Sequence, residues 1–292
     1  MGKFYFGLLA ILILASFTSC KKSQNAPAYV YIPKINVNSN YGINGSSSSN
    51  ITHVKVFNET ELIGVYELPI NVPVLDEGQA NIRCIGLINN NGSATSILDY
   101  IFYEPSANDV SLEGDKQVTI NPVVTYNPTS TADYWFEDFE GAGNAFFPGL
   151  GNVSEMIITE SPSEVFEGTA SAKFDLSADT AYSKYITNEQ FSYSVGKAAF
   201  LELDYKNNQI FFFSLILHHF SAPSEQLPVF QFNSTFNDDG DLEWNKIYID
   251  LGSILNNINS LSSFDICFEM ERDVSVDDPL VLIDNVKVIK RK

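Results

Sequence analysis

The chain has 292 residues, of which 45% are hydrophobic and 18% are charged, so it is long enough to form two domains that each bury a core. Its formal net charge is −19 at pH 7. An acidic surface repels phosphate groups, which argues against a nucleic-acid-binding protein. The apolar residues are rich in Val, Ile, Phe and Tyr, which favours β-sheet over helix.

The N-terminus reads as an export signal. "MGK" is a short basic start, and "FYFGLLAILILASF" is an apolar run too short to span a bilayer well. "FTSC" then ends at Cys20. The segment resembles a bacterial lipoprotein signal, with Phe17 where the usual pattern has Leu, as in the looser signals of Bacteroidetes-type bacteria.

That resemblance implies a signal peptide over residues 1–19, a lipid on Cys20 and a lipidated tether over 20–27. It implies an outer membrane lipoprotein, facing the periplasm or the cell surface, which meets the membrane through its N-terminal lipid only. The alternative is ordinary secretion, with Cys20 inside the removed peptide.

Residues 28–127 read as a first domain made of strands, with no convincing amphipathic helix. "HVKVFNETELIGVYELP" predicts two strands joined by a turn at Asn58–Thr60, and "ANIRCIGLI" and "KQVTINPVVTY" predict two more. "NSNYGINGSSSSN" reads as a loop. The domain resembles immunoglobulin-like and PEGA-type domains of bacterial surface proteins, which implies an Ig-like β-sandwich serving as a spacer or interaction module.

A second domain is expected over residues 134–292, after a polar linker at 128–133. Its ordered stretches "WFEDFEGAG" (135–143), "VFEGTASAKFDL" (165–176) and "VLIDNVKV" (281–288) resemble the jelly-roll sandwiches of carbohydrate-binding modules and galactose-binding-like domains. The expected fold class is therefore all-β, with two sandwiches. Cys84 and Cys267 each fall in an apolar strand, which favours buried free thiols over a disulfide.

The stretch "VLIDNVKV" raises a question about Asp284. Strict alternation puts Leu282, Asp284, Val286 and Val288 on one face, which is the apolar one, and puts Lys287 on the other. A buried carboxylate needs a partner. The resemblance implies a structural Ca2+ ion, with these ligands: Asp138, Glu140, Glu167, Ala170 and Asp284. The alternative is that Asp284 accepts backbone N–H groups from a loop.

A second acidic stretch, "NDDGDLE" (237–243), invites an EF-hand reading. The twelfth position counted from Asp238 is Ile249 rather than Glu, so a hairpin turn is the better prediction.

A polar sheet face is the candidate binding site. Alternation along three strands puts Leu201, Phe232 and Phe268 inward and polar residues opposite. If those strands share one sheet, its outer face gathers these residues: Glu202, Asp204, His218, Gln231, Asn233, Glu269 and Glu271. Carboxylates and amides suit sugar hydroxyls, although a merely solvated face is the simpler alternative.

The expected function is therefore an exported, non-catalytic protein that binds a glycan or cell-surface polymer. The second hypothesis is a structural or accessory protein-binding subunit of an envelope assembly, and the third is a glycan hydrolase with a carboxylate pair. The "DTA" at Asp179–Ala181 resembles the O-glycosylation acceptor of Bacteroidetes secreted proteins, which implies modification at Thr180.

Overall fold

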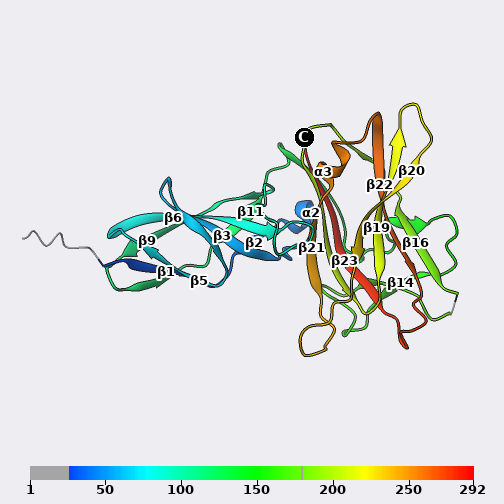
Figure 1. Ribbon diagram of the computed structural model, residues 1–292, viewed down its shortest axis with the longest axis horizontal. Helices are drawn as coiled ribbons and strands as arrows, with labels where there is room; N and C mark the ends of the chain where they lie inside the picture. The colour runs from blue at the N-terminus through cyan, green and yellow to red at the C-terminus, as the bar shows by residue number, and fades with distance from the viewer. Residues whose placement is uncertain (1–25, 179) are drawn as a thin grey trace, which may run out of the picture.

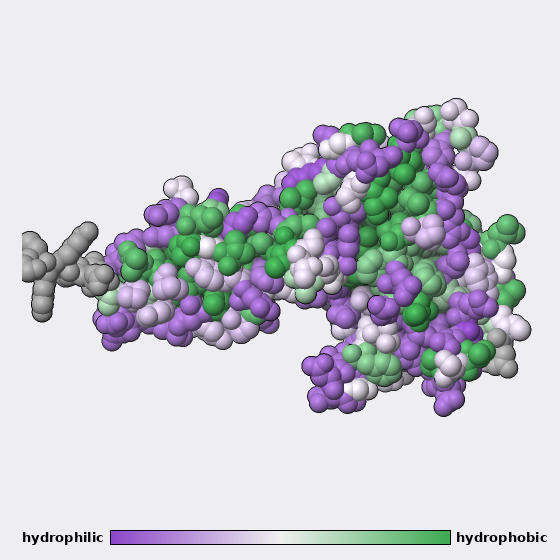
Figure 2. All heavy atoms as spheres, in the orientation of Figure 1, coloured by the Kyte–Doolittle hydropathy of each residue, from purple (hydrophilic) through white to green (hydrophobic). Residues whose placement is uncertain are grey.

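The computed structural model describes residues 26–178 and 180–292, which form two β domains arranged end to end (Figure 1). The chain enters at the far tip of the N-terminal domain and ends near the junction of the two domains. On the face seen in Figure 2, hydrophilic and apolar residues mix over the N-terminal domain, and apolar residues gather over part of the C-terminal domain. None of the described helices has the length and hydrophobicity needed to cross a membrane.

The N-terminal domain contains three small sheets around one apolar core. Their orders are β10–β1–β5, β2–β11–β8 and β4–β3–β6–β7, with β9 also pairing with β6. The strands are β1 (Ala28–Ile32), β2 (Asn36–Asn38), β3 (Ile51–Asn58), β4 (Glu61–Glu67), β5 (Ile70–Val74), β6 (Gly78–Asn89), β7 (Ile97–Asp99), β8 (Tyr103–Glu104), β9 (Ser106–Leu112), β10 (Gln117–Thr119) and β11 (Val123–Tyr126). The predicted hairpin at Asn58–Thr60 is confirmed, because β3 and β4 pair around it.

The C-terminal domain is a sandwich of two sheets, and the predicted all-β class and jelly roll are confirmed. The inner sheet has the order β14–β15–β23–β18–β21 with β12 on β23, and the outer sheet has the order β13–β16–β22–β19–β20 with β17 on β22. In Figure 1 the inner sheet lies against the N-terminal domain and the outer sheet lies beyond it. The two sheets enclose an apolar core.

The strands of the inner sheet are β12 (Ala132–Glu137), β14 (Met156–Thr159), β15 (Ser171–Phe174), β18 (Ala199–Asn207), β21 (Asn245–Asp250) and β23 (Val281–Arg291). Those of the outer sheet are β13 (Phe146–Pro148), β16 (Tyr182–Thr187), β17 (Phe191–Ser192), β19 (Phe211–His219), β20 (Glu225–Phe232) and β22 (Leu261–Glu271). Two short helices complete the described elements, α2 (Tyr41–Asn44) and α3 (Leu251–Leu255). The 237–243 stretch is a hairpin turn as predicted, with Phe236 bridged to Leu242.

Strand β23 does not alternate regularly. A bulge breaks its register with β18: Glu202 lies opposite Lys287, but Asp204 lies opposite Asp284. Asn285 adopts a positive φ of 47° at this point. The bulge adds one residue and reverses the alternation. Ile283 and Val286 therefore both face the sandwich core, and the prediction that Asp284 shares the core face, away from Lys287, is wrong.

The loop between β2 and β3 docks the N-terminal domain onto the inner sheet. The Tyr41 ring meets the edge of Phe136, with ring centroids 6.2 Å apart. Ser48 Oγ donates to Asp204 at 2.7 Å, and Asn50 Nδ2 donates to the Lys246 carbonyl at 3.2 Å. The Gly-, Ser- and Asn-rich loop is therefore an interface element.

Four charged side chains are buried at the domain junction. Glu202 and Asp204 of β18 face Lys246 of β21 at 3.5 and 3.3 Å, and Lys287 of β23 lies 3.6 Å from Glu202. Tyrosines of the N-terminal domain complete the set, because Tyr100 and Tyr126 donate to Glu202 at 2.7 and 2.9 Å. Two carboxylates and two ammonium groups balance, as buried charges require. We call these four charged residues the junction quartet.

Ordinary apolar packing continues across the junction. Phe200, Tyr248 and Ile289 of the C-terminal domain belong to the same core cluster as the residues of the N-terminal domain. The predicted linker at 128–133 is correspondingly short, because a turn over 128–131 leads directly into β12. Cys84 and Cys267 are both buried free thiols, as predicted, and burial raises the pKa of each to about 12.

Candidate functional site

The face of the outer sheet that points away from the sandwich core is the strongest candidate site. Strand β19 alternates regularly here, with Phe211, Phe213 and Leu215 buried in the core and Phe212 exposed on the outside. Strand β22 alternates in the same way, with Phe268 and Met270 inside. The outer sheet lies at the end of the molecule farthest from the N-terminal domain (Figure 1), and polar side chains such as those of Lys184, Gln231 and Glu269 lie on its outer face.

One cross-strand row runs through the middle of this face. The strand register places Lys184 of β16 opposite Glu269 of β22, Glu269 opposite Phe212 of β19, and Phe212 opposite Gln231 of β20. Residues directly opposite one another in antiparallel strands share a face and lie in contact range. We call Lys184, Glu269, Phe212 and Gln231 the central row.

Hydrogen bonds hold the polar members of the central row in place. Gln226 of β20 accepts from Lys184 Nζ at 2.5 Å and donates through Nε2 to Glu269 at 2.8 Å and to Ser214 Oγ at 3.1 Å. Lys184 Nζ lies 3.5 Å from the Glu269 carboxylate. Burial and the neighbouring Glu269 carboxylate raise the pKa of Tyr182 to about 12, so its hydroxyl keeps its proton at neutral pH.

Exposed aromatic side chains lie among these polar groups. Phe212 is 41% exposed and Phe147 of β13 is 45% exposed. Phe147 lies opposite Ile186, which puts it on the same outer face, one row from Lys184. An exposed aromatic ring between fixed donors and acceptors is a surface suited to a ligand with both apolar faces and hydroxyl groups.

Sequence reasoning missed Lys184, Gln226 and Phe212. The same alternation that placed the residues of β22 would have put Phe212 outside, because Phe211 and Phe213 flank it. Lys184 and Gln226 gave no comparable signal, since their strands could not be joined to β22 without the topology.

The predicted binding residues divide into two groups. His218, Gln231, Glu269 and Glu271 lie on strands of the outer sheet, and Asn233 follows β20 directly and accepts from Gln231 Nε2 at 3.1 Å. Glu202 and Asp204 lie on β18 of the inner sheet, where the N-terminal domain buries them. The prediction that these two join the outer face is wrong. Alternation along β18 was correct, but a second domain covers the face to which they point.

His218 lies toward one end of the outer face. Its Nε2 is 2.8 Å from Asp265 Oδ2 and its Nδ1 is 2.8 Å from Ser224 Oγ. Burial raises the pKa of Asp265, although the hydrogen bond with His218 opposes this. The three side chains therefore act as a cross-strand brace.

The residues predicted to bind calcium come from stretches that do meet. Glu140 accepts from Thr169 N at 2.8 Å and from Ala170 N at 3.0 Å. Asp284 accepts from Ser171 Oγ at 2.6 Å and from its neighbour Asn285 N at 2.7 Å. Strand β12 pairs with β23 along the same side of the sheet. The ordered stretches 135–143, 165–176 and 281–288 therefore lie side by side, as the resemblance implied.

The donor set at these carboxylates does not fit a cation. Backbone N–H groups and hydroxyls point at the oxygens of Glu140 and Asp284, whereas Ca2+ needs oxygens that converge on the ion. Asp138 accepts from Tyr41 Oη at 2.8 Å, and Glu167 accepts from Ser46 Oγ and Asn285 Nδ2. Within residues 26–178 and 180–292, no three acidic, His or Cys side chains form a metal-binding group. This geometry favours the alternative in which N–H groups satisfy Asp284.

Two further predicted positions have little structural context. Cys20 and the signal peptide lie outside the described residues. Thr180 is exposed, and Asp179 of the same motif lies outside the described residues.

Among known proteins, the chain is similar to solved structures only. No family model matches the chain, and no curated protein matches it. The chain is similar to the CBM22-1 xylan-binding domain of Paenibacillus barcinonensis Xyn10C, at 12% identity over 54% of this chain and 94% of that one, with a TM-score of 0.38. It is also similar to CBM29_1 of Piromyces equi, at 14% identity over 54% of this chain and 90% of that one, with a TM-score of 0.34. These likenesses concern the architecture alone.

Proposed function

We propose that the protein binds a glycan on the outer sheet of its C-terminal domain, with the central row as the recognition site. The observation that carries this proposal is the exposed Phe212 ring between the polar side chains of Glu269 and Gln231 on the outer face. A sugar ring presents C–H groups on one side and hydroxyls at its edge. The Phe212 ring can pack against the C–H groups, and the neighbouring polar side chains can form hydrogen bonds with the hydroxyls.

The polar groups supply both halves of the hydrogen bonds that hydroxyls make. Lys184 donates, Glu269 accepts, and the amides of Gln226 and Gln231 do both. Because hydrogen bonds already order Gln226 and Glu269, little side-chain freedom is lost on binding. The single cation on the row, against Glu269 and the nearby Glu271, favours uncharged over acidic polysaccharides.

The proposed role is binding without catalysis. Exposed strands build the face, and Glu269 is already engaged by a cation and an amide, so it is poorly placed as a general acid. Export and lipidation at Cys20 belong to the same proposal and rest on the N-terminal sequence. The lipid would hold the tip of the N-terminal domain near an outer membrane and the outer sheet away from it.

The test is a polysaccharide binding screen with the purified protein. We expect binding to one or more neutral polysaccharides, and Phe212→Ala to weaken it about tenfold or more, which equals about 1.4 kcal/mol. Phe236→Ala is the matched control, because Phe236 is also an exposed phenylalanine but lies in the β20–β21 connection. Absence of binding to any polysaccharide contradicts the proposal and favours a protein partner. An equal loss of affinity in Phe212→Ala and Phe236→Ala would mean that the central row is not the binding site.

A further inference from the structure

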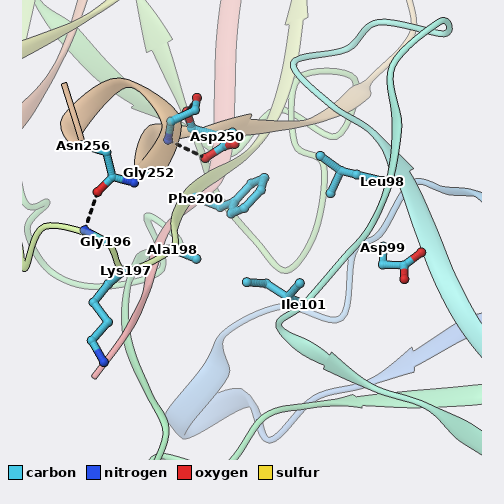
Figure 3. A pocket seen from close by; sticks show the side chains of 11 residues that line it. Leu98, Asp99, Ile101, Gly196, Lys197, Ala198, Phe200, Asp250, Gly252 and Asn256 are labelled. Carbon is cyan, nitrogen blue, oxygen red and sulfur yellow. Dashed lines mark hydrogen bonds between the residues drawn. The ribbon is translucent and has the colours of Figure 1, made fainter.

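A cavity of about 430 Å3 opens between the two domains, away from the central row (Figure 3). Its walls come from the 98–101 segment of the N-terminal domain and from the 196–200 and 250–256 segments of the C-terminal domain. This volume falls in the range of small-molecule sites, and domain junctions are common places for them.

The interior of the cavity is apolar. Leu98, Ile101 and Phe200 surround it, with Ala198 beside them (Figure 3). Ile101 is 42% exposed, so it has apolar surface that the fold leaves uncovered. The Phe200 ring packs edge-on against Tyr100, with centroids 5.3 Å apart, which fixes its position.

Hydrogen bonds across the junction hold the walls in place. Asn91 of the N-terminal domain accepts from Asp250 N at 2.9 Å. Arg291 donates to the Ile101 carbonyl at 2.7 Å. Within the C-terminal domain, Asn256 Oδ1 accepts from Gly196 N at 2.6 Å and so joins two segments of the wall. The cavity is therefore preformed, which reduces the entropy that a ligand must lose to bind.

The charges at the rim favour a cation. Asp99 is neutralised by Lys55 at 2.5 Å, and the Lys197 side chain extends away from Phe200 in Figure 3. The Asp250 carboxylate stands above the ring, where one oxygen accepts from Ser253 N at 3.0 Å. None of the described residues donates a hydrogen bond to its other oxygen, and Asp250 lies directly opposite Phe200 in the pairing of β18 with β21.

We propose that this cavity is a second binding site, which takes a small organic amine. The apolar body of the ligand lies against Leu98, Ile101 and Phe200, and its ammonium group pairs with Asp250. The site does not depend on glycan binding. Since the ligand touches both domains, binding stabilises the folded pair by mass action.

A matched series of probes tests the site on the intact protein. Cyclohexylamine, cyclohexanol and cyclohexanecarboxylate share one ring and differ in charge. We expect the amine to shift the backbone amide NMR signals of Gly196 and Ile101 saturably. The alcohol should bind at least about fivefold more weakly, and the carboxylate should not bind.

Two variants separate the charge from the fold. Asp250→Asn keeps an acceptor for Ser253 N, since Asn is also a good N-cap, but removes the charge. It should abolish the preference for amine over alcohol, while Asp239→Asn in the exposed 237–243 turn should leave it unchanged. The proposal is overturned if no probe binds, if all three bind equally, or if Asp250→Asn keeps the preference.

Discussion

Asp284 is a buried carboxylate with donors at both oxygens. Ser171 Oγ and Asn285 N each donate to it within 2.7 Å, and the bulge at Asn285 turns it away from the core. Burial, reinforced by the nearby Asp204 carboxylate, raises its pKa to about 7 despite these hydrogen bonds. The side chain therefore binds a proton more tightly in the folded state than in the unfolded chain.

The raised pKa of Asp284 predicts a pH-dependent stability. The contribution of Asp284 to the free energy of unfolding is fully present below about pH 4 and is lost as the pH rises toward 7. The reason is that over this range the carboxyl ionises in the unfolded chain but stays protonated in the folded state, which favours unfolding. Asp284→Asn mimics the protonated form, so its free energy of unfolding should improve relative to wild type by about 2 kcal/mol between pH 5 and pH 8. Urea unfolding at both pH values measures this. A constant difference, like that expected for Asp239→Asn, contradicts it.

The Asp284 carboxylate also bears on the prediction that the domain binds Ca2+. With N–H groups and hydroxyls directed at Asp284 and Glu140, we expect the melting temperature to be equal in millimolar Ca2+ and in chelator, within about 1 °C. A bound ion would raise it in proportion to its occupancy. A calcium-dependent rise that Asp284→Asn removes would restore the ion as a ligand of this corner.

At the scale of elements, the loop between β2 and β3 holds the domains together. Gly45 has a φ of 68°, and a Cβ there would lie 2.9 Å from the Phe136 ring. Glycine is required for both reasons. Gly42 in the same loop has no such φ, and its Cβ would meet nothing closer than 3.9 Å.

The two glycines give a matched pair of substitutions. Gly45→Ala should lower the free energy of unfolding by about 1–3 kcal/mol, since it combines backbone strain with a clash against the neighbouring domain. Gly42→Ala, in the short helix α2, should be neutral within about 0.5 kcal/mol. Chemical denaturation of both variants measures the difference. Equal values would mean that the loop does not carry the interface.

Alternation identified most strands and their inner faces, and ordered short motifs identified the jelly roll. Two kinds of information were missing from the sequence. The positive φ of Asn285 adds a residue to β23 and reverses its faces, and no residue type there demands a bulge. The Gly-, Ser- and Asn-rich segment read as a loop, but its hydrogen bonds to Asp204 and Lys246 depend on a partner surface that only the tertiary structure brings near. Glu202 was wrongly predicted to lie on an exposed face for the same reason, because the N-terminal domain that covers it is placed only by the tertiary structure.

At the scale of the whole molecule, the junction quartet joins the domains into one unit. Lys287 and Lys246 hold the pKa of Glu202 below its usual range although burial acts in the other direction. Burial lowers the pKa of Lys287 to about 8, opposed by Glu202. Each charge is therefore tolerated only because of its partners.

Removing one charge of the junction quartet should lower the free energy of unfolding of the whole protein. Glu202→Gln leaves the ammonium groups of Lys287 and Lys246 with too little compensating charge, and we expect a loss of about 3 kcal/mol. Glu271→Gln, which is exposed, should change stability by less than about 0.5 kcal/mol. Calorimetry should show one transition for wild type. Two separate transitions in the wild-type protein would contradict a single cooperative unit.

The positions of the chain entry and the outer sheet have a mechanical consequence. They lie at opposite ends of the long axis (Figure 1), with the junction quartet between them. A pull between the tip at β1 and a polymer held on β19 is therefore borne in series by both sandwiches and the contact between them. Such a load meets an interface held by buried ion pairs and tyrosine hydroxyls in place of a free hinge. The molecule should transmit tension as a stiff rod, with the junction as the link whose strength sets the force at which it yields.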